Sequence, residues 1–117
     1  MIEEDYVSFE VAKGLKEKGF NEYCEKSYSL DGKLYSNFPD DCILAPTLQM
    51  AAKWLRVVHK IDLCVFPCYY DYCLYGYDCK IYKNKELLCS LARFKTYEEA
   101  MNEALLLVLD RNSKIIQ

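Results

Sequence analysis

The sequence predicts an α+β fold: a single antiparallel sheet of about five strands with three helices, in the order α-β-β-α-β-β-β-α. Three stretches combine a capping residue with apolar side chains at helical spacing. The runs between them are rich in β-branched and aromatic residues and are joined by short turns, so consecutive strands should pair antiparallel. With 117 residues, 52% hydrophobic and 28% charged, residues 1–117 are predicted to form a single globular domain.

The first helix is predicted to begin after Ser8, whose hydroxyl suits an N-cap. Its apolar positions share one buried face and are Val11, Ala12 and Leu15. Gly19 should end the helix in the left-handed conformation, with Phe20 folding back onto it. Two short runs then flank Asp31-Gly32, a dipeptide typical of a two-residue type I′ hairpin turn.

A second helix is predicted from its N-cap Thr47 to about Lys60, after a loop over residues 37–46. Apolar side chains form a wide stripe on it: Leu48, Met50, Ala51, Ala52, Trp54, Leu55, Val57 and Val58. Such a stripe predicts the central helix of the core. For Trp54 it favours core packing over a role as an exposed binding residue.

Three strands are predicted over residues 61–70, 72–82 and 86–91, with a tight turn at 83–85. Both alternating sets of side chains on the first strand are apolar, so one set should face the helices and the other a second contact surface. The last helix follows Thr96, and Glu99 completes a capping box. Its buried face is predicted to be Tyr97, Ala100, Met101, Ala104, Leu105 and Val108.

Residues 64–79, CVFPCYYDYCLYGYDC, contain four cysteines: Cys64, Cys68, Cys73 and Cys79. Four thiolates can hold zinc, but their spacings of three, four and five intervening residues depart from the usual paired ligands. The first two would lie about 13 Å apart on one strand. We therefore predict no metal and no cofactor, and interpret the cysteines as small apolar side chains.

No enzymatic activity is predicted. A nucleophilic thiol requires a neighbouring base or cation, and the only histidine, His59, is expected at the surface near the end of the second helix, where a cation suits the helix dipole. The sequence contains no Gly-x-Ser-x-Gly, phosphate-binding glycine loop, HExxH or calcium-loop pattern. The commonest hydrolase, nucleotide-binding and metalloprotease motifs are therefore missing.

Five tyrosines of this segment are predicted to form a protein interface: Tyr69, Tyr70, Tyr72, Tyr75 and Tyr77. They are more than one sheet face can bury, and tyrosine is favoured at interfaces. A one-layer sheet that is apolar on both faces also leaves one face for a partner. We predict a small interaction protein that forms a homodimer or docks on a protein partner through the 61–91 sheet. In the competing interpretation the tyrosines only cover the sheet rim of a monomer.

The alternative function is binding of single-stranded nucleic acid through basic residues near the tyrosines. These residues are Lys80, Lys83, Lys85, Arg93 and Lys95. Residues 42–97 carry eight basic and four acidic side chains, whereas residues 1–41 carry five basic and ten acidic ones. Because the whole chain has a net charge of −3 and strong phosphate binding requires a concentrated basic field, this alternative is disfavoured.

The first ten residues, MIEEDYVSFE, lack the basic start and apolar run of a signal peptide. The longest strictly apolar run, ALLLVL, is far shorter than the roughly 18 residues that a membrane span requires. We therefore expect a cytoplasmic protein with no membrane segment, whose seven cysteines are reduced thiols.

Three stretches together resemble a family of short proteins found in gut bacteria and their phages or mobile elements. They are residues 4–20 (EDYVSFEVAKGLKEKGF), 45–63 (APTLQMAAKWLRVVHKIDL) and 97–110 (YEEAMNEALLLVLD). The resemblance covers about half of the chain and implies an accessory protein of a phage, prophage or other mobile element. It implies no catalytic or ligand-binding residues.

Overall fold

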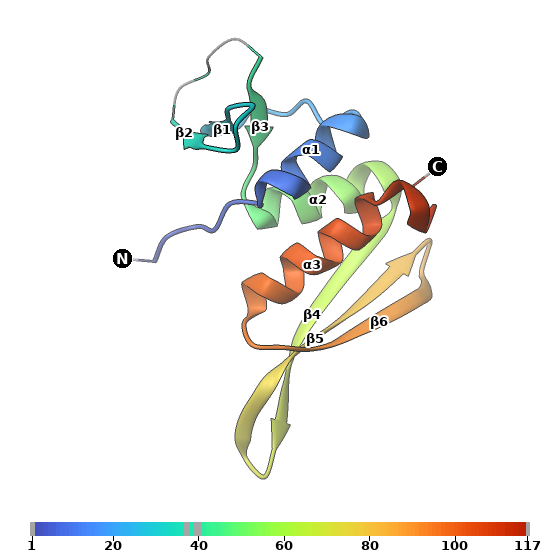
Figure 1. Cartoon of the computed structure of the whole chain (residues 1–117). Helices are drawn as coiled ribbons and strands as arrows, with labels where there is room; N and C mark the ends of the chain where they lie inside the picture. Colours follow the sequence, from blue (N-terminus) through green and yellow to red (C-terminus); the bar gives the residue numbers. More distant parts are fainter. Residues whose placement is uncertain (1, 37, 39–40, 117) are drawn as a thin grey trace.

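A computed structural model describes residues 2–36, 38 and 41–116. The helices of this part are α1 (Phe9–Glu17), α2 (Leu48–His59), α3 (Tyr97–Leu109) and the 3-10 helix η1 (Arg111–Ser113). The strands are β1 (Lys26–Tyr28), β2 (Leu34–Tyr35), β3 (Ile43–Ala45), β4 (Ile61–Tyr70), β5 (Cys73–Lys83) and β6 (Glu86–Phe94). They form two antiparallel sheets, ordered β2-β1-β3 and β4-β5-β6 (Figure 1).

The α+β class and the three helices are confirmed, but the single sheet of about five strands is wrong. β3 lies within the predicted loop 37–46, of which residues 37, 39 and 40 are outside the described part. It pairs with β1 over three residues and leads directly into α2. β2 and β3 pair with the two edges of β1. β1 therefore has no free edge with which to join the large sheet, and the small sheet packs separately beside α1.

The hairpin at Asp31-Gly32 is present, but its turn is not the predicted two-residue type I′. Tyr28 pairs with Leu34, so residues 29–33 form the connection. Only Gly32 of the dipeptide has a positive φ, 88°. The Ser29 side chain is hydrogen-bonded to the Asp31 carboxylate, and this local bond accompanies the wider loop.

Side-chain caps begin all three α-helices as predicted. The hydroxyls of Ser8, Thr47 and Thr96 accept hydrogen bonds from backbone N–H groups three residues on, over 3.0–3.3 Å. The carboxylate of Glu99 accepts from the N–H of Lys95, one residue before the expected partner in a capping box. Local chemistry therefore determines where these helices begin.

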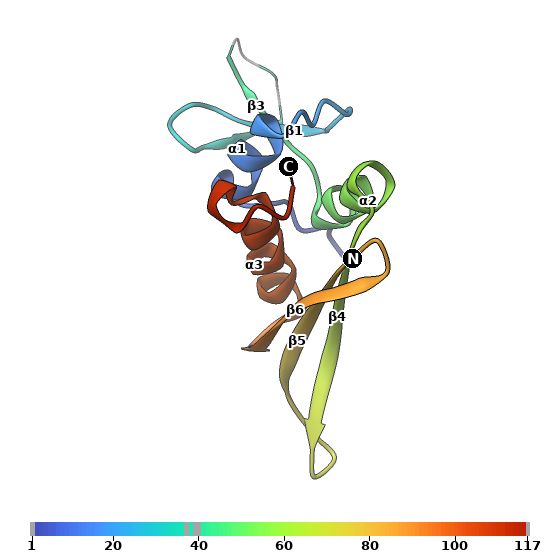
Figure 2. The same cartoon turned by 90° about the vertical axis from the view of Figure 1, so that its right-hand side faces the viewer.

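The core lies between the large sheet and the helices. Phe20 folds back as predicted, and its ring packs edge-on at 5.4 Å from that of Trp54, which is buried as predicted. α2 and α3 cover one face of the β4-β5-β6 sheet, while α1 packs on the far side of α3 (Figures 1 and 2). On that covered face Ile61 and Ile81 are fully buried.

The stripe on α2 is wider than the face that the core buries. Three of its predicted members are exposed: Met50 (39%), Val57 (57%) and Val58 (51%). The helix contacts β4 and α3, and these neighbours cover only part of its circumference. The prediction that the whole stripe is core is therefore wrong at these positions.

The three strands of the large sheet are predicted nearly correctly, with β6 reaching Phe94 where residue 91 was expected. Asn84 and Lys85 form a tight two-residue turn, both with positive φ. The last pair between β5 and β6 is Tyr77 with Phe94, whereas the β4–β5 ladder continues to Tyr70 and Cys73. The end of the β4–β5 hairpin therefore extends beyond the third strand.

Gly76 stands at the point where the hairpin leaves the three-stranded sheet. A Cβ atom on this residue would lie 2.8 Å from the carbonyl oxygen of Phe94. Because that oxygen belongs to the backbone, only a shift of the strands would relieve the clash. Glycine is required here for the close approach of β5 and β6.

We expect Gly76→Ala to lower the free energy of unfolding by about 1–3 kcal/mol, the usual effect of an added methyl group that displaces backbone. Ser90→Ala, at an exposed position of β6, is the control and should change it by less than about 0.5 kcal/mol. Urea denaturation followed by tryptophan fluorescence measures both. Equal stability of the two variants would contradict the close approach.

Candidate functional site

The candidate site is the hairpin tip, defined here as residues 68–76, which projects from the body of the molecule (Figure 2). Its strands pair only with each other. Asp71 and Tyr72 form the turn with φ of 52° and 63°, the left-handed region that a two-residue hairpin turn uses. Tyrosine is an unfavourable residue in that conformation, so its presence suggests selection for the side chain rather than for the turn.

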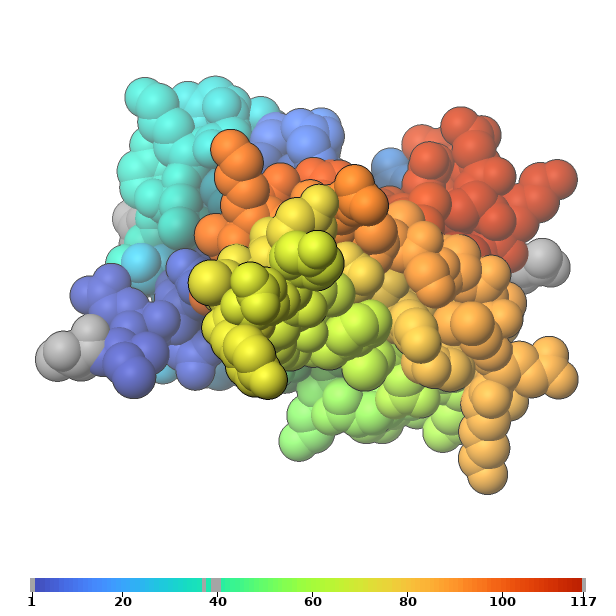
Figure 3. Space-filling model, turned by 90° about the horizontal axis from the view of Figure 1, so that it is seen from below, coloured from blue at the N-terminus to red at the C-terminus, as the bar shows by residue number. Residues whose placement is uncertain are grey.

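Large side chains of the hairpin tip are exposed to solvent. The exposed fractions are 66% for Tyr69, 78% for Tyr70, 99% for Tyr72, 50% for Leu74 and 61% for Tyr75. Viewed end-on, the tip stands in the foreground of the molecule and no other segment covers it (Figure 3). The structure thus brings four of the five predicted interface tyrosines together. The fifth, Tyr77, is half-buried, and its ring packs at 6.2 Å from that of Tyr97 on α3.

The outer face of the β4-β5-β6 sheet, opposite α2 and α3, continues from the tip. Cys64, Phe66 and Cys68 of β4 point to this face, as the alternating pattern predicted, and no helix of the described part covers it (Figures 1 and 2). The ammonium group of Lys80 lies 5.6 Å from the Phe66 ring centroid. The guanidinium of Arg93 lies 5.7 Å from that of Tyr75. Lys80 on this face and Arg93 near the tip therefore each lie over an aromatic ring.

The four cysteines of residues 64–79 do not share one environment. Cys79 is fully buried on the helix side, and burial together with the nearby Cys64 and Cys89 raises the pKa of its thiol to about 11. The pKa of the Cys68 thiol is raised by desolvation and by Asp78. The buried Cys79 thiol therefore stays protonated at neutral pH. Within the described residues no group of three or more histidine, cysteine or acidic side chains is arranged to hold a metal ion.

The basic residues of the nucleic-acid alternative are distributed over the sheet. Lys83 donates to the carbonyl of Ile115 over 2.5 Å, near the C-terminal end. Lys85 and Arg93 lie at opposite ends of β6, and Lys80 lies on the outer face. Lys95, beyond β6, donates its backbone N–H to Glu99. The structure does not gather these five side chains into one basic patch.

His59 is not the exposed cation predicted at the end of α2. Its ring lies 4.8 Å from the Trp54 ring, and its Nε2 atom is buried without a hydrogen-bond partner in the described part. Burial lowers the pKa of the imidazole, and the positive charges of Lys83 and Lys18 lower it further. The sequence placed His59 correctly on the helix but contained no sign of these tertiary neighbours.

This lowered pKa predicts loss of stability in mild acid. The unfolded chain protonates His59 near pH 6.5 and the folded chain only at lower pH, so the unfolded state binds more protons between these values. The melting temperature should be constant between about pH 7 and pH 8 and fall as the pH drops through 6.5. His59→Phe, which keeps a ring beside Trp54, should remove this slope between pH 7.5 and 5.5. Parallel curves for the two proteins would show that another group causes the loss.

Within the described residues no helix is long and apolar enough to cross a membrane. The chain matches no protein-family model, no curated protein and no solved structure. A function must therefore be inferred from the residues of this chain itself.

Proposed function

We propose that the protein is a small, non-enzymatic interaction protein that binds a protein partner through the hairpin tip and the outer face of the β4-β5-β6 sheet. The simplest partner is a second copy, in a symmetric homodimer in which the same surface meets itself. The observation that carries the proposal is the exposure of four tyrosines and Leu74 on a projecting, two-stranded tip. An accessory role for a phage or mobile element is supported by the resemblance of three sequence stretches.

Exposed aromatic groups on a bare hairpin are costly unless they meet a partner. A two-stranded ribbon is only marginally stable by itself in water. Tyrosine offers a large, rigid contact area with a polar end, and such residues carry much of the binding energy at interfaces. The tip therefore has the composition of a binding element and not of a solvated loop.

The expected strength of association follows from area. Burying about 100 Å² on each of four tyrosines would contribute on the order of 10 kcal/mol from each copy, and about 20 kcal/mol from the two copies of a homodimer. Association itself costs about 4–15 kcal/mol in lost translational and rotational freedom. The tip tyrosines of two copies therefore offset this cost, and contacts on the outer face add to the affinity. That face carries both Asp78 and Lys80, so a copy turned by a two-fold axis can present opposite charges to it.

We expect the Tyr70→Ser, Tyr75→Ser double variant to weaken self-association by at least tenfold while its melting temperature changes by only a few degrees. Both side chains are more exposed than buried, so the core loses no contact of consequence. Static light scattering over a dilution series measures the association. Tyr35→Ser is the control, because this tyrosine is 40% exposed and lies on β2, at the opposite end of the molecule (Figure 1).

Two results would contradict the proposal. A wild-type monomer at high micromolar concentration would eliminate the homodimer. Unfolding of the double variant would show that the tip tyrosines are structural. Tyr72→Gly distinguishes a role in the turn from a role in binding. Glycine suits the left-handed backbone of this position, and the substitution removes only the exposed ring. It should weaken association and leave the hairpin intact.

A further inference from the structure

A second surface with different chemistry runs along α2. Two hollows adjoin at Met50, each with a volume of about 250 Å³. One lies between Pro46, Tyr6 and Tyr23, and the other lies against Trp54 and Val57. We call the two together the α2 groove. Its floor is apolar, and it includes side chains of the α2 stripe that the core leaves exposed.

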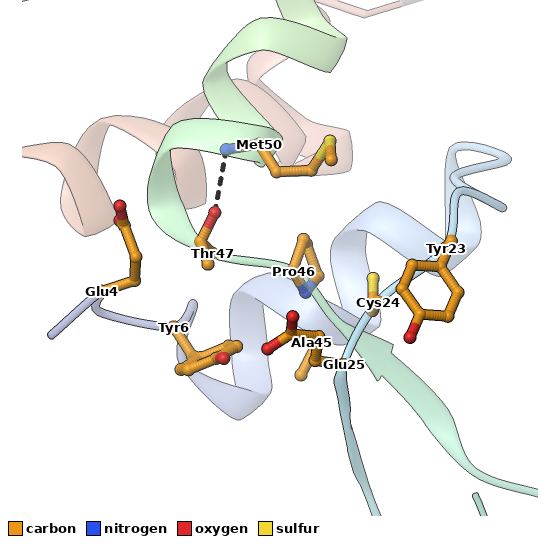
Figure 4. A pocket seen from close by; sticks show the side chains of 9 residues that line it. All are labelled: Glu4, Tyr6, Tyr23, Cys24, Glu25, Ala45, Pro46, Thr47 and Met50. Atoms are coloured by element: carbon orange, nitrogen blue, oxygen red, sulfur yellow. Dashed lines mark hydrogen bonds between the residues drawn. The ribbon is translucent and has the colours of Figure 1, made fainter. Parts of the chain in front are cut away.

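The wall formed by the N-terminal segment is held by backbone hydrogen bonds. Leu48 N–H donates to the carbonyl of Asp5 over 2.9 Å, and Val7 N–H donates to that of Pro46 over 3.0 Å. Tyr6 thereby forms an antiparallel bridge with Thr47. The Lys26 ammonium lies 4.8 Å from the Tyr6 ring centroid. Figure 4 shows Tyr6 and Tyr23 on opposite sides of Pro46, with Met50 above. The groove is therefore present before any ligand binds.

The rim of the groove is acidic. Glu4, Glu22 and Glu25 line it together with a single base, Lys53, so acids outnumber bases, and none of the three carboxylates has an ion-pair partner within 4.0 Å among the described residues. Burial and then the charges of Glu25 and Glu4 raise the pKa of the Tyr6 phenol. Burial and Glu22 raise the pKa of the Cys24 thiol to about 11. Burial is the larger cause of both shifts, and the neighbouring carboxylates are the smaller one.

The N-terminus of α2 also lies at the groove, but it is not available to bind an anion. The Thr47 hydroxyl accepts the N–H of Met50 over 3.1 Å, and the first helical N–H, that of Leu48, already donates to Asp5. Helix N-termini bind anions through free N–H groups, and those of Leu48 and Met50 are occupied here. The lining thus favours a cation beside an apolar group.

We propose that the α2 groove binds a basic peptide segment of another protein, one in which lysine or arginine alternates with apolar side chains. The cationic group pairs with Glu4 and Glu25, and its cation–π contact is with the Tyr23 ring because Lys26 already lies over the Tyr6 ring. The stem of such a side chain covers apolar surface while its charge stays near water. The apolar neighbours of the segment pack on Met50, Trp54 and Val57, and methionine adapts to irregular partners.

This site is independent of the proposed function, because it contains no residue of the hairpin tip or of the outer sheet face. A second copy of the chain is a less suitable occupant. The exposed hairpin tip carries no lysine or arginine, and Lys83 is already bonded to Ile115. The acidic rim instead matches a strongly basic segment.

The experiment uses three fluorescein-labelled peptides of 12 residues and measures anisotropy on titration with the full-length protein. The first alternates lysine and leucine, the second replaces each lysine by glutamate, and the third replaces each leucine by serine. We expect the first to bind with an affinity that falls as salt rises. The third should bind at least tenfold more weakly and the second not measurably.

Site-specific variants connect this binding to the groove. Glu4→Gln with Glu25→Gln should weaken binding of the lysine–leucine peptide three- to tenfold, and Met50→Ser should weaken it further. Glu86→Gln with Glu103→Gln removes the same charge at exposed positions outside the groove lining and should change little. The Tyr70→Ser, Tyr75→Ser variant should bind the peptide like wild type.

Several results would overturn the proposal. One is an equal loss of peptide affinity in the two glutamine double variants. Another is measurable binding of the glutamate peptide. The third is a change of NMR amide chemical shifts, on addition of peptide, in the hairpin tip and not along residues 46–58. Weaker self-association of the Glu4→Gln, Glu25→Gln variant in light scattering would identify a second copy as the occupant and exclude the foreign peptide. If the tyrosine variant alone loses association, the proposed function stands and the groove is judged separately.

Discussion

The packing of α3 is the constraint on which the rest of the structure depends. This helix contacts α1, α2 and all three strands of the large sheet. Ala100 and Ala104 are fully buried on it, and a Cβ on Gly14 of α1 would lie 3.0 Å from that of Leu109, so the helices approach closely on small residues. Because α1 lies on the far side of α3, only α2 and α3 among the described helices cover the sheet. They pack on one face, and no described helix covers the outer face.

The same helix determines the length of the strands. β6 ends at Phe94 because the chain must turn into α3, which Thr96 caps two residues later. β4 and β5 have no such restriction and continue as a pair. The projecting hairpin tip thus results from a mismatch in strand length, and Gly76 allows β5 to approach the Phe94 carbonyl closely at the point where β6 ends. The position and length of the hairpin tip are therefore determined by the packing of α3 on the sheet.

Features with local causes could be predicted from the sequence, and features with distant causes could not. Ser8, Thr47 and Thr96 identified the helix starts because each cap bonds within three residues. The pairing of β1 with β3 joins positions 15 or more residues apart, and no pattern in so short a strand indicated it. The exposure of Met50 and the burial of His59 likewise depend on which neighbours reach α2. For the candidate site, four tyrosines were grouped correctly because they flank one turn, whereas Tyr77 belongs with α3 through a contact across the fold.

The uneven charge of the sequence corresponds to the two proposed surfaces. The acidic first 41 residues supply Glu4, Glu22 and Glu25 to the rim of the α2 groove. The more basic residues 42–97 supply the sheet, where Lys80 and Arg93 lie over aromatic rings. Lys60 alone separates α2 from β4, so the groove and the sheet share one rigid connection. One acidic surface and one aromatic surface on one small framework favour two different partners held in a fixed orientation, because each surface complements a different chemistry.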